Sequence, residues 1–119
     1  MEKDILEKSL SDLSNKSYIF SINVISFAKT LQKRGFEAEI VNNFVNLSGN
    51  MADTLLDTAD LKNTNEIIVN LEKSSTFAQK LFQSLQDFKS EGTLLNEKVD
   101  LQIENHLILK RINSLLSDV

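Results

Sequence analysis

Apolar residues recur every three or four positions along most of the chain, which is the spacing of one face of an α-helix. The clearest example lies in residues 17–34, where five apolar residues share one helical face: Phe20, Val24, Phe27, Ala28 and Leu31. A second apolar row, formed by Tyr18, Ile22 and Ile25, lies beside the first. We therefore expect a wide buried stripe on this helix, as is typical of a helix that touches two neighbours.

Three further segments repeat this spacing, and strand-like alternation is absent. We predict four helices, at about residues 17–34, 37–59, 64–90 and 94–117. Gly35 and Gly92 mark two of the helix ends, and Asn63 with Glu66 has the spacing of a capping box at the start of the third helix. With no Pro and only three Gly, the chain has few breaks. Long helices with short connections predict an all-α, antiparallel up-down-up-down four-helix bundle.

The first 16 residues form an amphipathic segment of their own, because Ile5, Leu6, Leu10 and Leu13 lie roughly on one helical face. We expect residues 1–16 to form a helical arm and residues 17–119 to form the bundle. The arm either extends the first helix or folds separately. It packs either on its own bundle or on a neighbouring subunit.

Small residues interrupt the apolar stripes of the second and third helices near their middles. They are Ser48, Gly49, Ala52, Ser74, Ser75 and Ala78. Gly in a helix interior costs about 1 kcal/mol relative to Ala, so Gly49 needs a structural reason. We expect these residues to let two facing helices approach closely, in which case Gly49→Leu destabilises the fold by about 1 to 3 kcal/mol through overpacking.

The charge distribution limits the kinds of partner. A formal net charge of -4 argues against broad electrostatic capture of nucleic acid, which usually requires a basic surface. Lys29, Lys33 and Arg34 end the first helix, whereas Lys110 and Arg111 lie late in the fourth. In an antiparallel bundle these two groups lie at opposite ends. A continuous surface for RNA or DNA therefore forms only if oligomerisation brings them together.

The sequence carries little catalytic chemistry. Without Cys, disulfides and thiolate metal sites are excluded, and His106 is the single histidine. His106 and Arg111 are five positions apart, the reverse of the order in helical ribonucleases that pair the two, so that signal is weak. The row of Asp53, Asp57 and Asp60 is either a cation site or, as we favour, a solvated face. We predict no enzyme activity, catalytic residue, metal or cofactor.

No stretch reaches the roughly 20 apolar residues needed to span a bilayer, and the start "MEKDILEKSLSDL" has no signal-peptide pattern. We therefore expect a cytoplasmic protein that does not contact a membrane.

Three stretches resemble the four-helix-bundle proteins encoded in intervening sequences of bacterial 23S ribosomal RNA genes. They are "NKSYIFSINVISFAKTL", "LSGNMADTLLDTA" and "LKRINSLL", and their order and spacing agree with the family across about residues 15–117. The chain departs from the family pattern at Leu47, where an Arg is usual, and at Asp53-Thr54-Leu55, where Gly-Ala-Asn is usual. The resemblance implies a homo-oligomeric ring, most often a pentamer, without established enzymatic activity.

Three hypotheses follow. The first is a non-enzymatic, self-associating bundle that serves as an interaction or scaffold protein. The second is a nucleic-acid-binding accessory protein, because related proteins that accompany diversity-generating retroelements bind nucleic acid, although they are basic. The third, which we favour least, is a helical nuclease or metal enzyme that uses His106 and a carboxylate.

Overall fold

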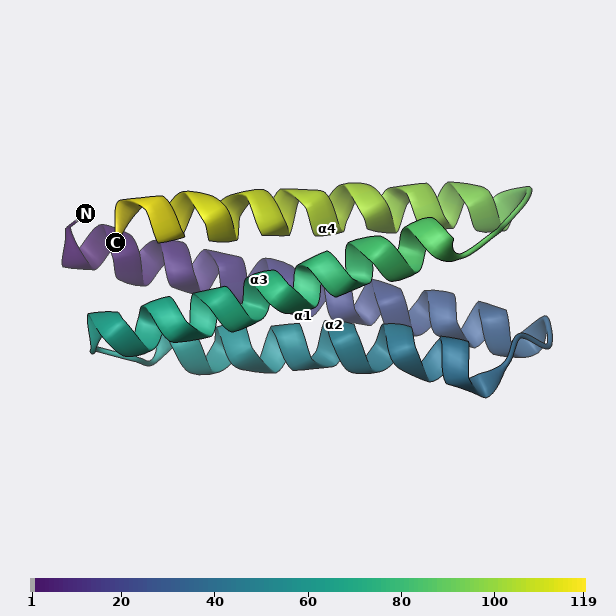
Figure 1. Cartoon of the computed structure of the whole chain (residues 1–119), viewed down its shortest axis with the longest axis horizontal. Helices are drawn as coiled ribbons and strands as arrows, with labels where there is room; N and C mark the ends of the chain where they lie inside the picture. Colours follow the sequence, from purple (N-terminus) through teal and green to yellow (C-terminus); the bar gives the residue numbers. More distant parts are fainter. Residues whose placement is uncertain (1) are drawn as a thin grey trace.

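The computed structural model describes residues 2–119, and these residues form four α-helices (Figure 1). The helices are α1 (Lys3–Lys33), α2 (Ala38–Ala59), α3 (Thr64–Asp87) and α4 (Thr93–Asp118). They pack lengthwise into a body of 47 × 20 × 19 Å, and residues 2–119 contain no strand. The predicted all-α class and the number of helices are confirmed. No helix of residues 2–119 has an apolar stretch that would cross a membrane.

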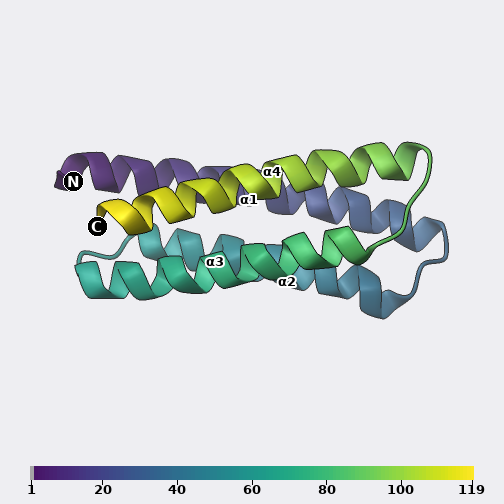
Figure 2. The same ribbon diagram turned by 45° about the horizontal axis from the view of Figure 1, so that its top comes forward.

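Short connections join the helices at alternate ends of the body (Figures 1 and 2). The α1–α2 and α3–α4 connections lie at one end, and the α2–α3 connection lies at the other end together with both termini. Helix α1 packs against α2 and α4, and α3 packs against the same two helices. Each helix therefore has two neighbours and one side that faces away from the bundle.

Local signals fix the helix ends. Gly35 follows α1 with φ 82°, a left-handed conformation that Gly adopts without strain. Asn63 caps α3, since its side-chain oxygen accepts a hydrogen bond from the Glu66 backbone N at 3.1 Å. Helix α3 ends at Asp87, before the predicted residue 90, because Phe88 is extended (ψ 115°) and buries its ring in the core.

The predicted boundary at residue 16 between an arm and the bundle is absent. Helix α1 runs from Lys3 without a break, so residues 3–16 extend the first helix. Leu10 and Leu13 are 2% and 0% exposed within the single chain, and Lys62 forms an ion pair with Glu7 at 3.2 Å. The part of the amphipathic face formed by Leu10 and Leu13 is therefore covered by the chain's own bundle, whereas Ile5 is 52% exposed.

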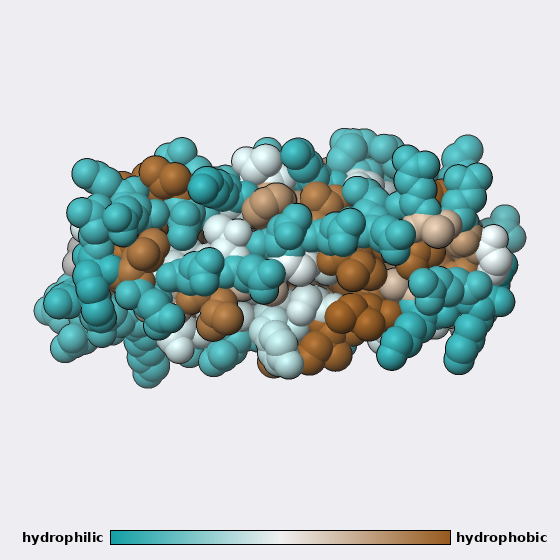
Figure 3. Space-filling view, turned by 90° about the horizontal axis from the view of Figure 1, so that it is seen from below, coloured by the Kyte–Doolittle hydropathy of each residue, from teal (hydrophilic) through white to brown (hydrophobic). Residues whose placement is uncertain are grey.

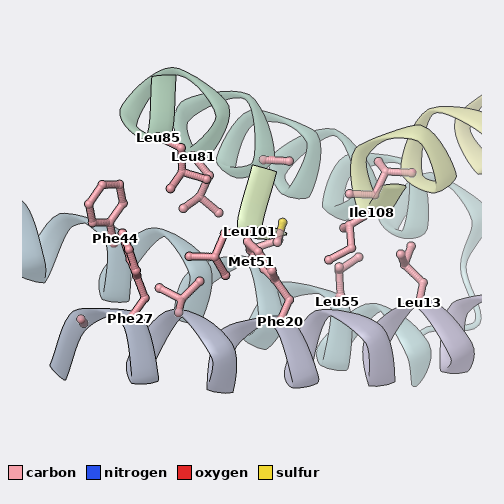
Figure 4. Packing of buried hydrophobic residues seen from close by; sticks show 14 of the residues in the cluster. Leu13, Phe20, Phe27, Phe44, Met51, Leu55, Leu81, Leu85, Leu101 and Ile108 are labelled. Carbon is pink, nitrogen blue, oxygen red and sulfur yellow. The ribbon is translucent and has the colours of Figure 1, made fainter. Parts of the chain in front are cut away.

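All four helices contribute to one hydrophobic core (Figure 4). Figure 4 shows Leu13, Phe20 and Phe27 of α1 pointing towards side chains of the other helices. Phe27 packs edge-on against Phe44 at 6.0 Å and against Phe88 at 5.8 Å between ring centroids. This aromatic cluster fixes the end of the bundle that carries the α1–α2 connection.

One polar contact crosses the core. Asn105 of α4 is 1% exposed, and its Nδ2 donates a hydrogen bond to the Ala78 carbonyl of α3 at 2.9 Å. Its Oδ1 has no partner within the described residues. Because a buried amide is costly to leave unpaired, this bond favours one lengthwise alignment of α3 and α4.

Candidate interaction surface

Two neighbouring segments carry no charged side chain at all. They are residues 17–28 of α1 and residues 40–52 of α2, and every Asp, Glu, Lys and Arg lies outside them. The two segments lie side by side, since α1 packs on α2 and the rings of Phe27 and Phe44 meet between them. We call the exposed surface of these two segments the uncharged face.

Large apolar side chains point outward on the α1 part of this face. Tyr18, Ile22 and Ile25 are 63%, 47% and 41% exposed, and we call them the outer row. The prediction that these residues belong to a wide buried stripe is wrong. Tyr18 and the fully buried Phe20 are about 160° apart around the helix, so the neighbours that cover one cannot cover the other.

Other large apolar residues at helical spacing on α2, α3 and α4 are also exposed. They are Ile40, Leu56, Phe82, Leu95, Val99 and Ile103, all between 38% and 58% exposed. Three of them, Leu95, Val99 and Ile103, form a second exposed row on α4 at intervals of four residues. The outer row differs from that row because its own segment, residues 17–28, carries no charge before Lys29, whereas Glu97, Lys98 and Asp100 lie within the α4 row.

The space-filling view in Figure 3 shows the face of the molecule that includes α2. Hydrophilic residues cover both ends of this face, whereas hydrophobic and neutral residues gather near its middle and towards one end. Contiguous exposed apolar patches usually mark interaction sites. The buried centres of protein interfaces are likewise poor in charge and rich in aromatic residues. The uncharged face therefore has the composition of an interface centre.

The small residues have two different environments. Five of the six are buried, as close packing requires: Ser48, Ala52, Ser74, Ser75 and Ala78. Gly49 is only half-buried, and a Cβ added to it meets no atom within 4 Å. Gly49 therefore does not mark a close approach of two helices within the chain, and the overpacking expected for Gly49→Leu has no structural basis.

The basic residues of the two predicted groups lie far apart within one chain. Arg34 Nη2 donates to Thr93 Oγ1 at 3.2 Å, so the end of α1 with Lys29 and Lys33 lies beside the start of α4. Lys110 and Arg111 lie roughly 26 Å further along α4 at 1.5 Å per residue. A single chain therefore presents no continuous basic surface.

The residues considered for catalysis or metal binding are dispersed. His106 is exposed on α4, and Asp53, Asp57 and Asp60 are exposed along α2 and its end. Across residues 2–119, no group of three or more His, Cys, Asp or Glu side chains is placed to hold a metal ion.

Comparison of the chain with protein-family models, characterised proteins and solved structures finds no match.

Proposed function

We propose that this chain is a cytoplasmic, non-enzymatic scaffold or interaction protein that self-associates through its uncharged face. The outer row is the observation that carries the proposal, because three large apolar side chains stand next to each other in a segment, residues 17–28, that carries no charge. The outer side of a helix in a monomeric bundle normally carries charged and polar residues. Removing apolar surface from water gains about 25 cal/mol per Å², so covering this row is favourable.

The proposal takes the fold to be an up-down-up-down antiparallel bundle. Connections that alternate between the two ends support this order (Figures 1 and 2). The short connections, such as the one between Lys33 and Ala38, also favour antiparallel neighbours, because a parallel neighbour needs a crossover as long as the bundle.

A second copy of the chain is the partner that best fits this face. The net charge of -4 makes two copies repel each other wherever charged surfaces meet. The uncharged face is where that repulsion is weakest and where apolar surface is available. The resemblance to the ribosomal RNA intervening-sequence proteins adds a specific expectation, a ring of five copies, and we include family membership and this number in the proposal.

Light scattering of the purified chain tests self-association. We expect a mass that is a multiple of 13.5 kDa, and five times that value for the ring. The double variant Ile22→Lys, Ile25→Lys places two charges in the outer row and should lower the mass to that of one chain. Val69→Lys is the matched control, because Val69 is a 51% exposed apolar residue on α3, outside the uncharged face.

Two outcomes contradict the proposal. A wild-type chain that stays monomeric at all accessible concentrations excludes self-association. An unchanged mass in the double variant excludes the uncharged face as the contact. Helix content measured by circular dichroism should stay at the wild-type level in all variants, since Ile22 and Ile25 lie outside the core.

The nucleic-acid alternative needs the two basic groups to converge between chains. Their separation within one chain gives it no support, and we do not propose it. Salt-dependent binding of the oligomer to RNA, with log affinity falling linearly against log salt, is the result that would revive it.

A further inference from the structure

A second surface runs along the line where α1 meets α4, which we call the seam. Two grooves lie end to end along it, and Glu104 borders both. One groove is acidic, with Glu97 and Asp100 beside Glu104. The other is lined by the apolar side chains of Ile19, Leu107 and Ile108 and by the cations of Lys16 and Arg111. The seam therefore has an acidic part, an apolar centre and a basic part, in that order.

Contacts between the helices fix how α1 and α4 align along the seam. Asn23 Nδ2 donates to both carboxylate oxygens of Glu104 at 3.1 Å, and Arg34 contacts Thr93 further along. This alignment places Lys16 beside Arg111, in the same groove. Two cations from different helices thus mark the basic part of the seam.

The charges of the seam have no ion-pair partners within the chain. Across residues 2–119 the single ion pair joins Lys62 to Glu7, far from the seam. Ile19 and Leu107, at the apolar centre, are each 56% exposed. The seam therefore presents charges of both signs, none of them in an ion pair, on either side of exposed apolar side chains.

We propose that the seam binds the seam of a second copy of this chain in the reversed direction, across a two-fold axis midway between Asp100 and Arg111, within one helical turn of Leu107. This pairing rests on the self-association proposed above. It adds a second contact between copies, besides the uncharged face, and gives that contact two-fold symmetry. Reversal places the basic part of each copy over the acidic part of the other. Asp100 and Arg111 lie about 16 Å apart along α4, so a partner of that length spans both charged parts.

Charge complementarity favours a second copy of the chain as the partner that binds the seam. A two-fold interface is self-complementary, since each contact occurs twice. The order acidic, apolar, basic satisfies this condition. When one copy is reversed, the acidic part of each copy meets the basic part of the other, and the two apolar parts meet each other. A uniformly charged partner such as a nucleic acid is attracted by Lys16 and Arg111 and repelled by Glu97 and Asp100. Only a partner with the inverted pattern meets both parts favourably.

Two charge-reversed proteins test the pairing. The first, Lys16→Glu with Arg111→Glu, makes the seam acidic throughout. The second, Glu97→Lys with Asp100→Lys, adds two cations to its acidic part and leaves the Glu104 contact with Asn23 in place. Neither should pair with itself, so each should sediment with a lower mass than wild type. An equimolar mixture of the two should return to the wild-type mass, because the reversed seams now complement each other.

The control for net charge is Lys73→Glu with Lys80→Glu, which changes two exposed cations of α3 away from the seam. It should keep the wild-type mass. If wild type associates and neither reversed protein nor their mixture differs from it, the seam pairing is wrong and self-association through the uncharged face stands. A five-chain mass that both reversals leave unchanged likewise contradicts the seam pairing. A wild-type chain that never associates overturns both proposals.

Discussion

The two sides of α1 carry similar side chains and have opposite environments. On the inner side, Phe20 and Val24 are 0% and 1% exposed, whereas on the outer side Tyr18 and Ile22 are 63% and 47% exposed. Both rows have the spacing of a helical face, so the pattern of apolar positions does not distinguish them. Periodicity identifies residues that share a face, but only packing shows which face the chain itself covers.

The difference in burial between the two rows distinguishes residues that stabilise the folded chain from residues that are available for association. The inner row is covered whenever the chain folds, so its apolar surface stabilises the monomer. The outer row is covered only when another molecule is present, and any stabilisation from it depends on concentration. Substitutions in the two rows should therefore differ in kind as well as in size.

The largest expected effect is on the inner row. Phe20→Ala removes a fully buried ring and leaves a cavity, so the free energy of unfolding should fall by about 3 to 5 kcal/mol. Urea unfolding followed by circular dichroism measures this. A loss below about 1 kcal/mol would mean that the inner row is not the core, and the contrast between the two sides of α1 would disappear.

A smaller loss is expected at the polar residue of the core. Asn105→Ala removes the hydrogen bond to the Ala78 carbonyl and should cost about 1 to 3 kcal/mol in unfolding free energy. Asn113→Ala is the matched control, since Asn113 is an exposed Asn on the same helix. Equal effects of the two substitutions on the urea midpoint would show that burial of Asn105 contributes nothing.

Gly49 should respond with a gain in stability. Because a Cβ added there meets no atom within 4 Å, Gly49→Ala should raise the unfolding free energy by about 0.5 to 1 kcal/mol through helix propensity. The measurement is the melting temperature at a concentration at which the chain is monomeric. A lower melting temperature would show that two helices do approach closely at Gly49, as the sequence suggested.

The smallest effect on folding should come from the outer row. Ile22→Ser should change the unfolding free energy of the dilute monomer by less than about 0.5 kcal/mol, as is usual for surface substitutions. At high concentration the same substitution should lower the mass of the assembly. A loss of several kcal/mol at high dilution would show that Ile22 belongs to the fold of the single chain.

Much of the fold could be predicted from the sequence, because its signals are local. The apolar spacing predicts four helices, and Gly35 and the Asn63 cap sit where the pattern places them. The start of α1 could not be predicted, since Ser14 breaks the apolar spacing although it is buried beside Leu13. A small polar residue such as Ser14 is buried where two helices meet. Whether it is buried depends on residues far away in the sequence, so the local pattern does not show it.

The candidate surface was harder to predict from the sequence. Tyr18, Ile22 and Ile25 looked like core residues because hydrophobicity alone does not say whether the covering partner is the same chain. One signal was available in the sequence: residues 17–28 have no charge on any side of the helix. A helix with a solvated outer side usually shows charges there, so the missing charges are the sequence signal that agrees with the proposed contact.

The most direct test uses the absence of Cys from the chain. In the variant Ile22→Cys the new thiol lies in the outer row, and in the control Thr76→Cys it lies on the exposed side of α3. The rate of maleimide labelling is measured for both across a wide range of protein concentration. If the uncharged face meets another copy, labelling at position 22 slows as the concentration rises and labelling at position 76 does not. Equal rates at both positions and at every concentration would contradict the account.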